Sequence, residues 1–124
     1  MQRTLGVWGA GLGLLAVAAG AFGSHLLRDS LDVARLEIFQ TAARYQMYHA
    51  LALLLVANLG EAWSRRWTNW AGWCFVGGTV IFAGSLYGLS LTGIRVLGAI
   101  TPLGGLLLMA GWGLLMLAGL QKSA

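Results

Sequence analysis

The sequence predicts an all-α integral membrane protein with four transmembrane helices and a short interfacial amphipathic helix between the first and second. Hydrophobic residues make up 58% of the 124 residues and charged residues 10%, with a mean hydropathy of +0.74. A soluble domain of this length could not bury so much apolar surface. From Asn69 to Gln121 the only charge is Arg95, and this stretch is long enough for two crossings of about 20 residues each. The length favours one domain, residues 1–124.

The first span is expected at about residues 5–22. Small residues recur there at steps of three and four, a spacing that lets a second helix approach closely. The glycines of this predicted packing face are Gly6, Gly9, Gly13 and Gly20. A secretory signal is the alternative, because Arg3 precedes the apolar stretch and residues 16–18 resemble a cleavage site. The glycine pattern and the extension of the apolar stretch to Phe22 favour a retained helix.

Residues 30–40 are predicted to form the amphipathic helix. Leu31, Ala34 and Ile38 repeat at helical spacing among charged residues, and Asp29 or Ser30 is a plausible N-cap. Such a helix would lie in the membrane interface, and a solvated loop is the alternative.

The second span, about residues 41–59, is the most polar. Its cleanly apolar part, residues 50–59, is about half as long as a crossing requires, so the helix must include the preceding residues. These bring Arg44, Gln46 and His49 into the membrane. Arg44 can snorkel back to the interface, whereas His49 should lie well inside.

The third and fourth spans, about residues 70–91 and 96–120, are joined by so short a turn that they must form an antiparallel hairpin. Close-approach surfaces are predicted at Gly84 and Gly88 on one helix and at Gly98 and Gly105 on the other. Tryptophans and arginines in residues 63–73 are typical of the lipid–water boundary.

The charges give no clear orientation. Arg3, Arg65, Arg66 and Lys122 fall on one side, and Arg28, Arg35, Arg44 and Arg95 on the other. We expect both termini to be cytoplasmic, because acidic neighbours partly neutralise the second group.

Polar residues of the first two spans and the hairpin gather toward one leaflet. They form a candidate polar pocket for a headgroup, a quinone or a small solute, because polar groups at this depth often have a function. Its members are His25, Gln40, Arg44, Gln46, Tyr48, His49 and Thr101. The alternative, which we favour, is a network in which Gln46 or His49 hydrogen bonds to Ser85, Tyr87 or Thr101.

The sequence predicts no catalytic residues, metal site or cofactor, and the protein is not expected to be an enzyme. No carboxylate falls within a predicted span, and the two histidines lack a haem or zinc motif. The lone Cys74 is expected to be a packing residue. No basic, aromatic-rich stripe predicts nucleic-acid binding.

Several stretches resemble a small bacterial inner-membrane family catalogued as domain of unknown function 423, which has eukaryotic transmembrane relatives. They are Gly20 to His25, Phe39 to Ala42, Tyr45 to Ala52, Gly84 to Tyr87, Leu91 to Gly93, Leu97 to Gly105, and Gly111 with Trp112. The resemblance implies a multi-pass inner-membrane protein with four helices, the first of them retained. It implies no catalytic residues, since the family has no agreed activity.

These observations favour a non-enzymatic structural or accessory component of the membrane or of a larger complex. The expected partners are membrane lipids and, beyond them, other membrane subunits or a second copy of the chain. A small-ligand or lipid-binding pocket or conduit in the second span is the alternative function.

Overall fold

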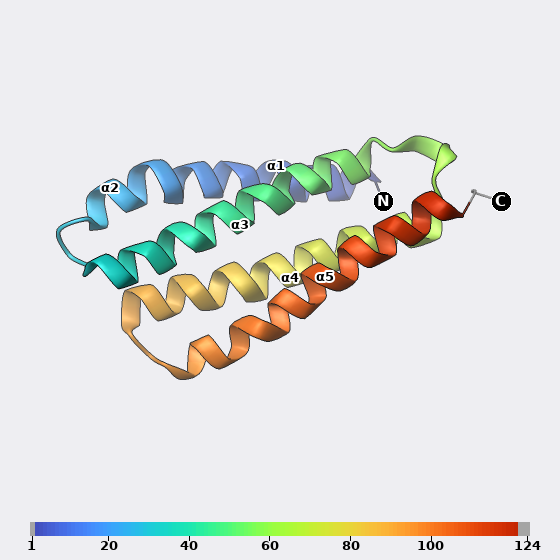
Figure 1. The fold of residues 1–124 in the computed structure, drawn as a ribbon. Coiled ribbons are helices and arrows are strands. Elements are labelled where there is room, and N and C mark those ends of the chain that lie inside the picture. Colours follow the sequence, from blue (N-terminus) through green and yellow to red (C-terminus); the bar gives the residue numbers. More distant parts are fainter. Residues whose placement is uncertain (1, 122–124) are drawn as a thin grey trace.

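The computed structural model describes residues 2–121 and shows four long helical rods packed side by side in an up-and-down arrangement (Figure 1). The helix at the N-terminal end of the chain begins at the same end of the bundle where the last helix finishes. In order, the elements are α1 (Gln2–Val17), η1 (Ala18–Gly23), α2 (Ser24–Leu27), α3 (Val33–Ala57), η2 (Gly60–Ala62), α4 (Arg65–Thr92) and α5 (Val96–Leu120). No strand occurs among these described residues.

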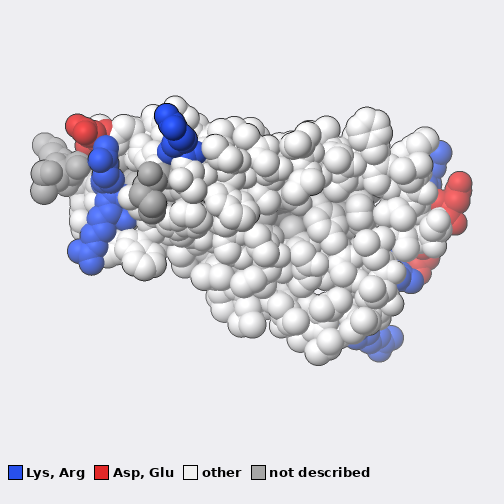
Figure 2. All heavy atoms as spheres, turned by 180° about the vertical axis from the view of Figure 1, so that it is seen from behind, with Lys and Arg blue, Asp and Glu red and all other residues white. Residues whose placement is uncertain are grey.

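Three helices are long and apolar enough to cross a membrane: Gln2–Leu27, Arg65–Thr92 and Val96–Leu120. On the face shown in Figure 2, acidic and basic side chains gather toward the two ends and leave a broad uncharged band between them. An all-helical architecture with apolar helices therefore agrees with the prediction.

The first rod runs from Gln2 to Leu27 and includes a π-helical turn, η1, between α1 and α2. The small residues of the first rod face α3. A Cβ added to Gly6, Gly13 or Gly20 would lie 3.4 to 3.7 Å from an alanine Cβ of α3. At Gly9 the added atom would lie 2.8 Å from the carbonyl oxygen of Ala50, so this glycine permits the closest approach.

The expected separate amphipathic helix at residues 30–40 is wrong. Helix α3 begins at Val33 and continues without a break to Ala57, because neither glycine nor proline interrupts it. Its N-cap is Asp32, whose carboxylate accepts a hydrogen bond of 2.8 Å from the backbone N–H of Arg35. Asp29 and Ser30 lie in the preceding turn instead.

Helices α4 and α5 form the predicted hairpin. Gly93 ends α4 in the left-handed conformation, with φ of 74°, and its N–H bonds to the carbonyl of Leu89. Along the hairpin, Gly88 and Gly98 meet leucines across the interface, and Gly105 meets the ring of Phe82. Gly84, in contrast, faces open space.

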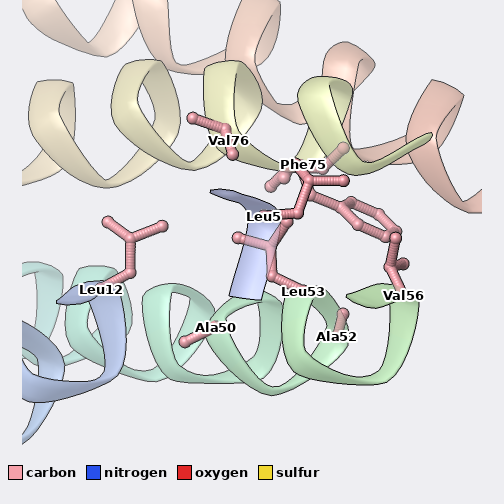
Figure 3. Close-up of a cluster of buried hydrophobic side chains, with 9 residues drawn as sticks. Leu5, Leu12, Ala50, Ala52, Leu53, Val56, Phe75 and Val76 are labelled. Atoms are coloured by element: carbon pink, nitrogen blue, oxygen red, sulfur yellow. The ribbon is translucent and has the colours of Figure 1, made fainter. Parts of the chain in front are cut away.

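A cluster of buried apolar side chains lies where α1, α3 and α4 meet, with Leu108 added from α5 (Figure 3). Leu5, Leu53, Val56 and Phe75 are completely buried there. Leu5 reaches this position because α4 has a glycine, Gly72, opposite its side chain. Small residues on one helix thus make room for large ones on the next.

A matched pair of alanine substitutions tests the packing of the hairpin. A Cβ at Gly104 would lie 2.8 Å from the Cα of Phe82, a backbone contact that cannot yield without separating α4 from α5. Gly104→Ala should therefore destabilise the protein by about 1–3 kcal/mol, as overpacking typically does. Gly84→Ala, which adds the same methyl group to open space, should leave the melting temperature in detergent unchanged or higher. Equal losses for both variants would contradict the hairpin geometry.

Candidate functional site

One glutamine joins three helices in the interior of the bundle. Gln46 of α3 is 4% exposed. Its amide nitrogen donates to the carbonyl oxygen of Leu12 in α1 at 2.8 Å, and its amide oxygen accepts from the hydroxyl of Tyr87 in α4 at 2.7 Å. Both ends of the side chain are thereby paired, as burial of an amide requires.

His49, one turn further along α3, is equally buried and has both ring nitrogens engaged. Its Nδ1 lies 2.8 Å from the carbonyl oxygen of Tyr45, and its Nε2 lies 3.0 Å from the indole nitrogen of Trp112. A carbonyl only accepts and an indole N–H only donates. His49 is therefore a neutral imidazole with its proton on Nδ1, and Trp112 of α5 donates to Nε2.

Aromatic rings surround this histidine. The ring of Phe75 lies 5.4 Å away and that of Trp112 5.9 Å away, measured between centroids, and Tyr45 stacks on the other side at 6.5 Å. The imidazole is thus held in an apolar, aromatic setting in which its two hydrogen bonds are its polar contacts among the described residues.

A third polar contact joins α4 to α5. The hydroxyls of Ser85 and Thr101 lie 2.5 Å apart, and each is also within hydrogen-bond distance of a carbonyl one helical turn back in its own helix. Together with Gln46 and His49, this pair places interhelical hydrogen bonds across α1, α3, α4 and α5.

The seven residues of the candidate pocket fall into separate places. Gln46, His49 and Thr101 belong to the three hydrogen-bond groups above. Gln40 and Arg44 line a groove between α3 and the first rod. Tyr48 is half exposed, with its ring 5.6 Å from that of Tyr45. His25 is exposed in α2, near the end of the first rod.

Two contacts were missed in the sequence. The first is the bond from Trp112 to His49, which the sequence analysis did not predict. An indole N–H in an apolar helix needs an acceptor, and this requirement could have pointed to the contact. The second contact joins Arg35 to α4: its Nε donates to the carbonyl oxygen of Ser90 at 2.8 Å, near the C-terminal end of α4, where the helix dipole favours a cation.

The bond between His49 and Trp112 can be measured by a double-mutant cycle. His49→Leu and Trp112→Phe each remove one partner, and the double variant removes both. We expect a coupling free energy of about 0.6 kcal/mol, with an upper range near 1.7 kcal/mol, the range found for hydrogen bonds between membrane helices. Unfolding in mixed micelles provides the measurement. Strictly additive effects would show that the two side chains do not interact.

The apolar helices and the polar contacts between them define the class: an all-helical membrane protein. Comparison with known proteins identifies the family. The chain matches the family described as "Protein of unknown function (DUF423)" over residues 19–105, and it belongs to that family.

Curated relatives cover nearly the whole chain. A "UPF0382 membrane protein" from Staphylococcus epidermidis is 46% identical over 115 residues, covering 93% of each chain. The "UPF0382 membrane protein YwdK" from Bacillus subtilis is 43% identical, covering 93% of this chain and 94% of the relative. No solved structure matches the chain significantly.

Proposed function

We propose that this protein is a four-pass, non-enzymatic structural or accessory component of the bacterial inner membrane. The observation that carries the proposal is the use of the polar side chains inside α3. The amide nitrogen and oxygen of Gln46 and both ring nitrogens of His49 have hydrogen-bond partners. These partners lie on other helices or on the α3 backbone. Such groups hold helices together rather than await a ligand.

The fourth crossing is α3. Its 25 residues extend about 37 Å at 1.5 Å per residue, and residues 38–57 alone cover a hydrocarbon core of about 30 Å, so the charged first turns with Arg35 and Glu37 can lie outside it. Its low overall hydropathy comes from its charged first turns and from polar residues that face the other helices. The side chains that point outward along its second half, such as Tyr48, Leu51 and Leu55, are apolar or aromatic. A helix with this distribution can cross lipid although its average composition is polar.

Cysteine labelling tests this crossing. In a Cys74→Ala background, which removes the single native thiol, we expect Ser30→Cys and Glu61→Cys to react with a membrane-impermeant maleimide from opposite sides of the membrane. Leu51→Cys, half exposed at mid-helix, should react only after the membrane is dissolved, because lipid covers it. Labelling of Ser30→Cys and Glu61→Cys from the same side would contradict a fourth span.

Both termini are proposed to be cytoplasmic. Three of the four acidic residues, Asp29, Asp32 and Glu37, lie beside the arginines at the end of the bundle where α3 begins, whereas Glu61 is the acidic residue at the end where α4 begins. The end where α4 begins therefore has the larger excess of positive charge, and positive side chains favour the cytoplasmic side.

Non-enzymatic function agrees with the placement of the acidic residues. All four of them are exposed near the ends of the helices, so none can act with His49 inside the bundle. Paired acid–base chemistry therefore has no interior site. The alternative of a pocket centred on Gln46 and His49 has less support, since their polar atoms are already engaged.

Association with other membrane proteins or with a second copy is favoured by the outward-facing glycines. Gly11, Gly84 and Gly113 each face open space and form flat surfaces suited to close helix contact. We expect protein purified in mild detergent to have a mass, by light scattering, above that of one 13.1 kDa chain. Gly84→Leu and Gly113→Leu should then identify the face involved. A strictly monomeric protein without a stoichiometric partner would argue against this role.

A further inference from the structure

A groove lies between α3 and the first rod, beside the π-helical turn η1. It has a volume of about 320 Å³. The groove exists because the facing residues are small: a Cβ added to Gly20 would lie 3.6 Å from the Cβ of Ala43. Its lining residues are Ala16, Gly20, Gln40, Ala43, Arg44 and Met47. Irregular π-helical turns such as η1 often occur at binding sites.

The groove has a polar end and an apolar end. Because α3 and the first rod run in opposite directions, Gln40 lies toward the end of the bundle where α3 begins, and Met47 and Ala16 lie deeper. Arg44 is about 10 Å along the helix axis from Glu37, at 1.5 Å per residue, and a long arginine side chain can extend back toward the end of the bundle where Glu37 lies. A ligand that fits this gradient has a polar head near Gln40 and Arg44 and an apolar tail that extends toward the middle of the membrane.

The charge in the groove is Arg44, which forms no ion pair within the described part of the chain. The guanidinium of Arg44 donates to the hydroxyl of Thr41 at 3.2 Å, and that hydroxyl donates to the carbonyl oxygen of Glu37 at 2.9 Å. These bonds direct the side chain toward the surface end of α3. Within residues 2–121 the ion pair that forms is Arg65 with Glu61, at the opposite end of the bundle. A lipid-facing arginine in this situation favours an anion.

We propose that this groove binds one anionic glycerophospholipid, with its phosphate on Arg44 and Gln40 and an acyl chain along Ala16 and Met47. The inference rests on the proposed crossing by α3. Guanidinium and phosphate form paired, charge-assisted hydrogen bonds, and basic pockets between membrane helices recognise anionic head groups. The apolar end of the groove selects a lipid over free phosphate. Among the described residues, the lining of the groove contains no carboxylate that could attract the ammonium group of a zwitterionic lipid.

Native mass spectrometry of the full-length protein in detergent tests the proposal. The protein is titrated with phosphatidylglycerol or with phosphatidylcholine of the same acyl chains, and the bound lipids are counted. We expect one phosphatidylglycerol to bind at least several-fold more tightly than phosphatidylcholine. Arg44→Gln should weaken its binding about tenfold and abolish the preference, as loss of a charge-assisted hydrogen bond implies.

Two further variants separate a specific site from general attraction. Arg28→Gln removes the same charge from an exposed position at the same end of the bundle and should leave binding unchanged. Gly20→Leu keeps the charge and fills the groove, so it should also weaken binding, with helicity checked by circular dichroism.

Equal binding of both lipids, or equal losses for Arg28→Gln and Arg44→Gln, would overturn the proposal. So would a dimer that Gly20→Leu dissociates, because a second chain would then occupy the groove. The labelling experiment on α3 tests the crossing separately.

Discussion

The structure depends on one constraint: the large polar side chains buried between the helices must find hydrogen-bond partners within the bundle. Helix α3 contains two of them, the amide of Gln46 and the imidazole of His49, and lies between α1 and α4. Gln46 meets this constraint through Leu12 and Tyr87, and His49 meets it through Tyr45 and Trp112. The positions of α1, α4 and α5 relative to α3 therefore follow from where these few side chains can form hydrogen bonds.

Close packing by glycine is the second requirement. The bonds of Gln46 need α1 within reach of α3, and Gly9 allows this approach because its missing Cβ leaves room for the backbone at Ala50. Gly104 does the same for α5 against Phe82 of α4. An apolar side chain gains little by contacting another helix instead of lipid, because both are apolar. Close packing and hydrogen bonds between the helices therefore account for their association. Glycines such as Gly9 thus bring hydrogen-bonding side chains within reach, while others such as Gly72 make room for apolar side chains.

The outer surface differs from the interior in a way that bears on function. Gln46 and His49 have hydrogen-bond partners inside the bundle, whereas Arg44, exposed on α3, forms no ion pair with the residues that the structure describes. The charged side chain that is available to a ligand therefore lies on the outer surface of α3. A structural role for the bundle and a specific bound lipid are compatible, because the lipid would fill a gap between α3 and the first rod.

The sequence by itself determined the membrane class, the helical hairpin of α4 and α5 and the glycine face of the first rod, because apolar length and small-residue spacing are local properties. It did not determine that Gly84 faces open space rather than α5. It did not determine the start of α3, where Asp32 rather than Asp29 or Ser30 is the cap, since several nearby residues have suitable side chains. It also raised Tyr87 only as one of several possible partners and did not identify Trp112. Tyr87 is 41 residues from Gln46 and Trp112 is 63 residues from His49. Only the tertiary structure decides such pairings, because they depend on how far and at what rotation each helix packs against the next.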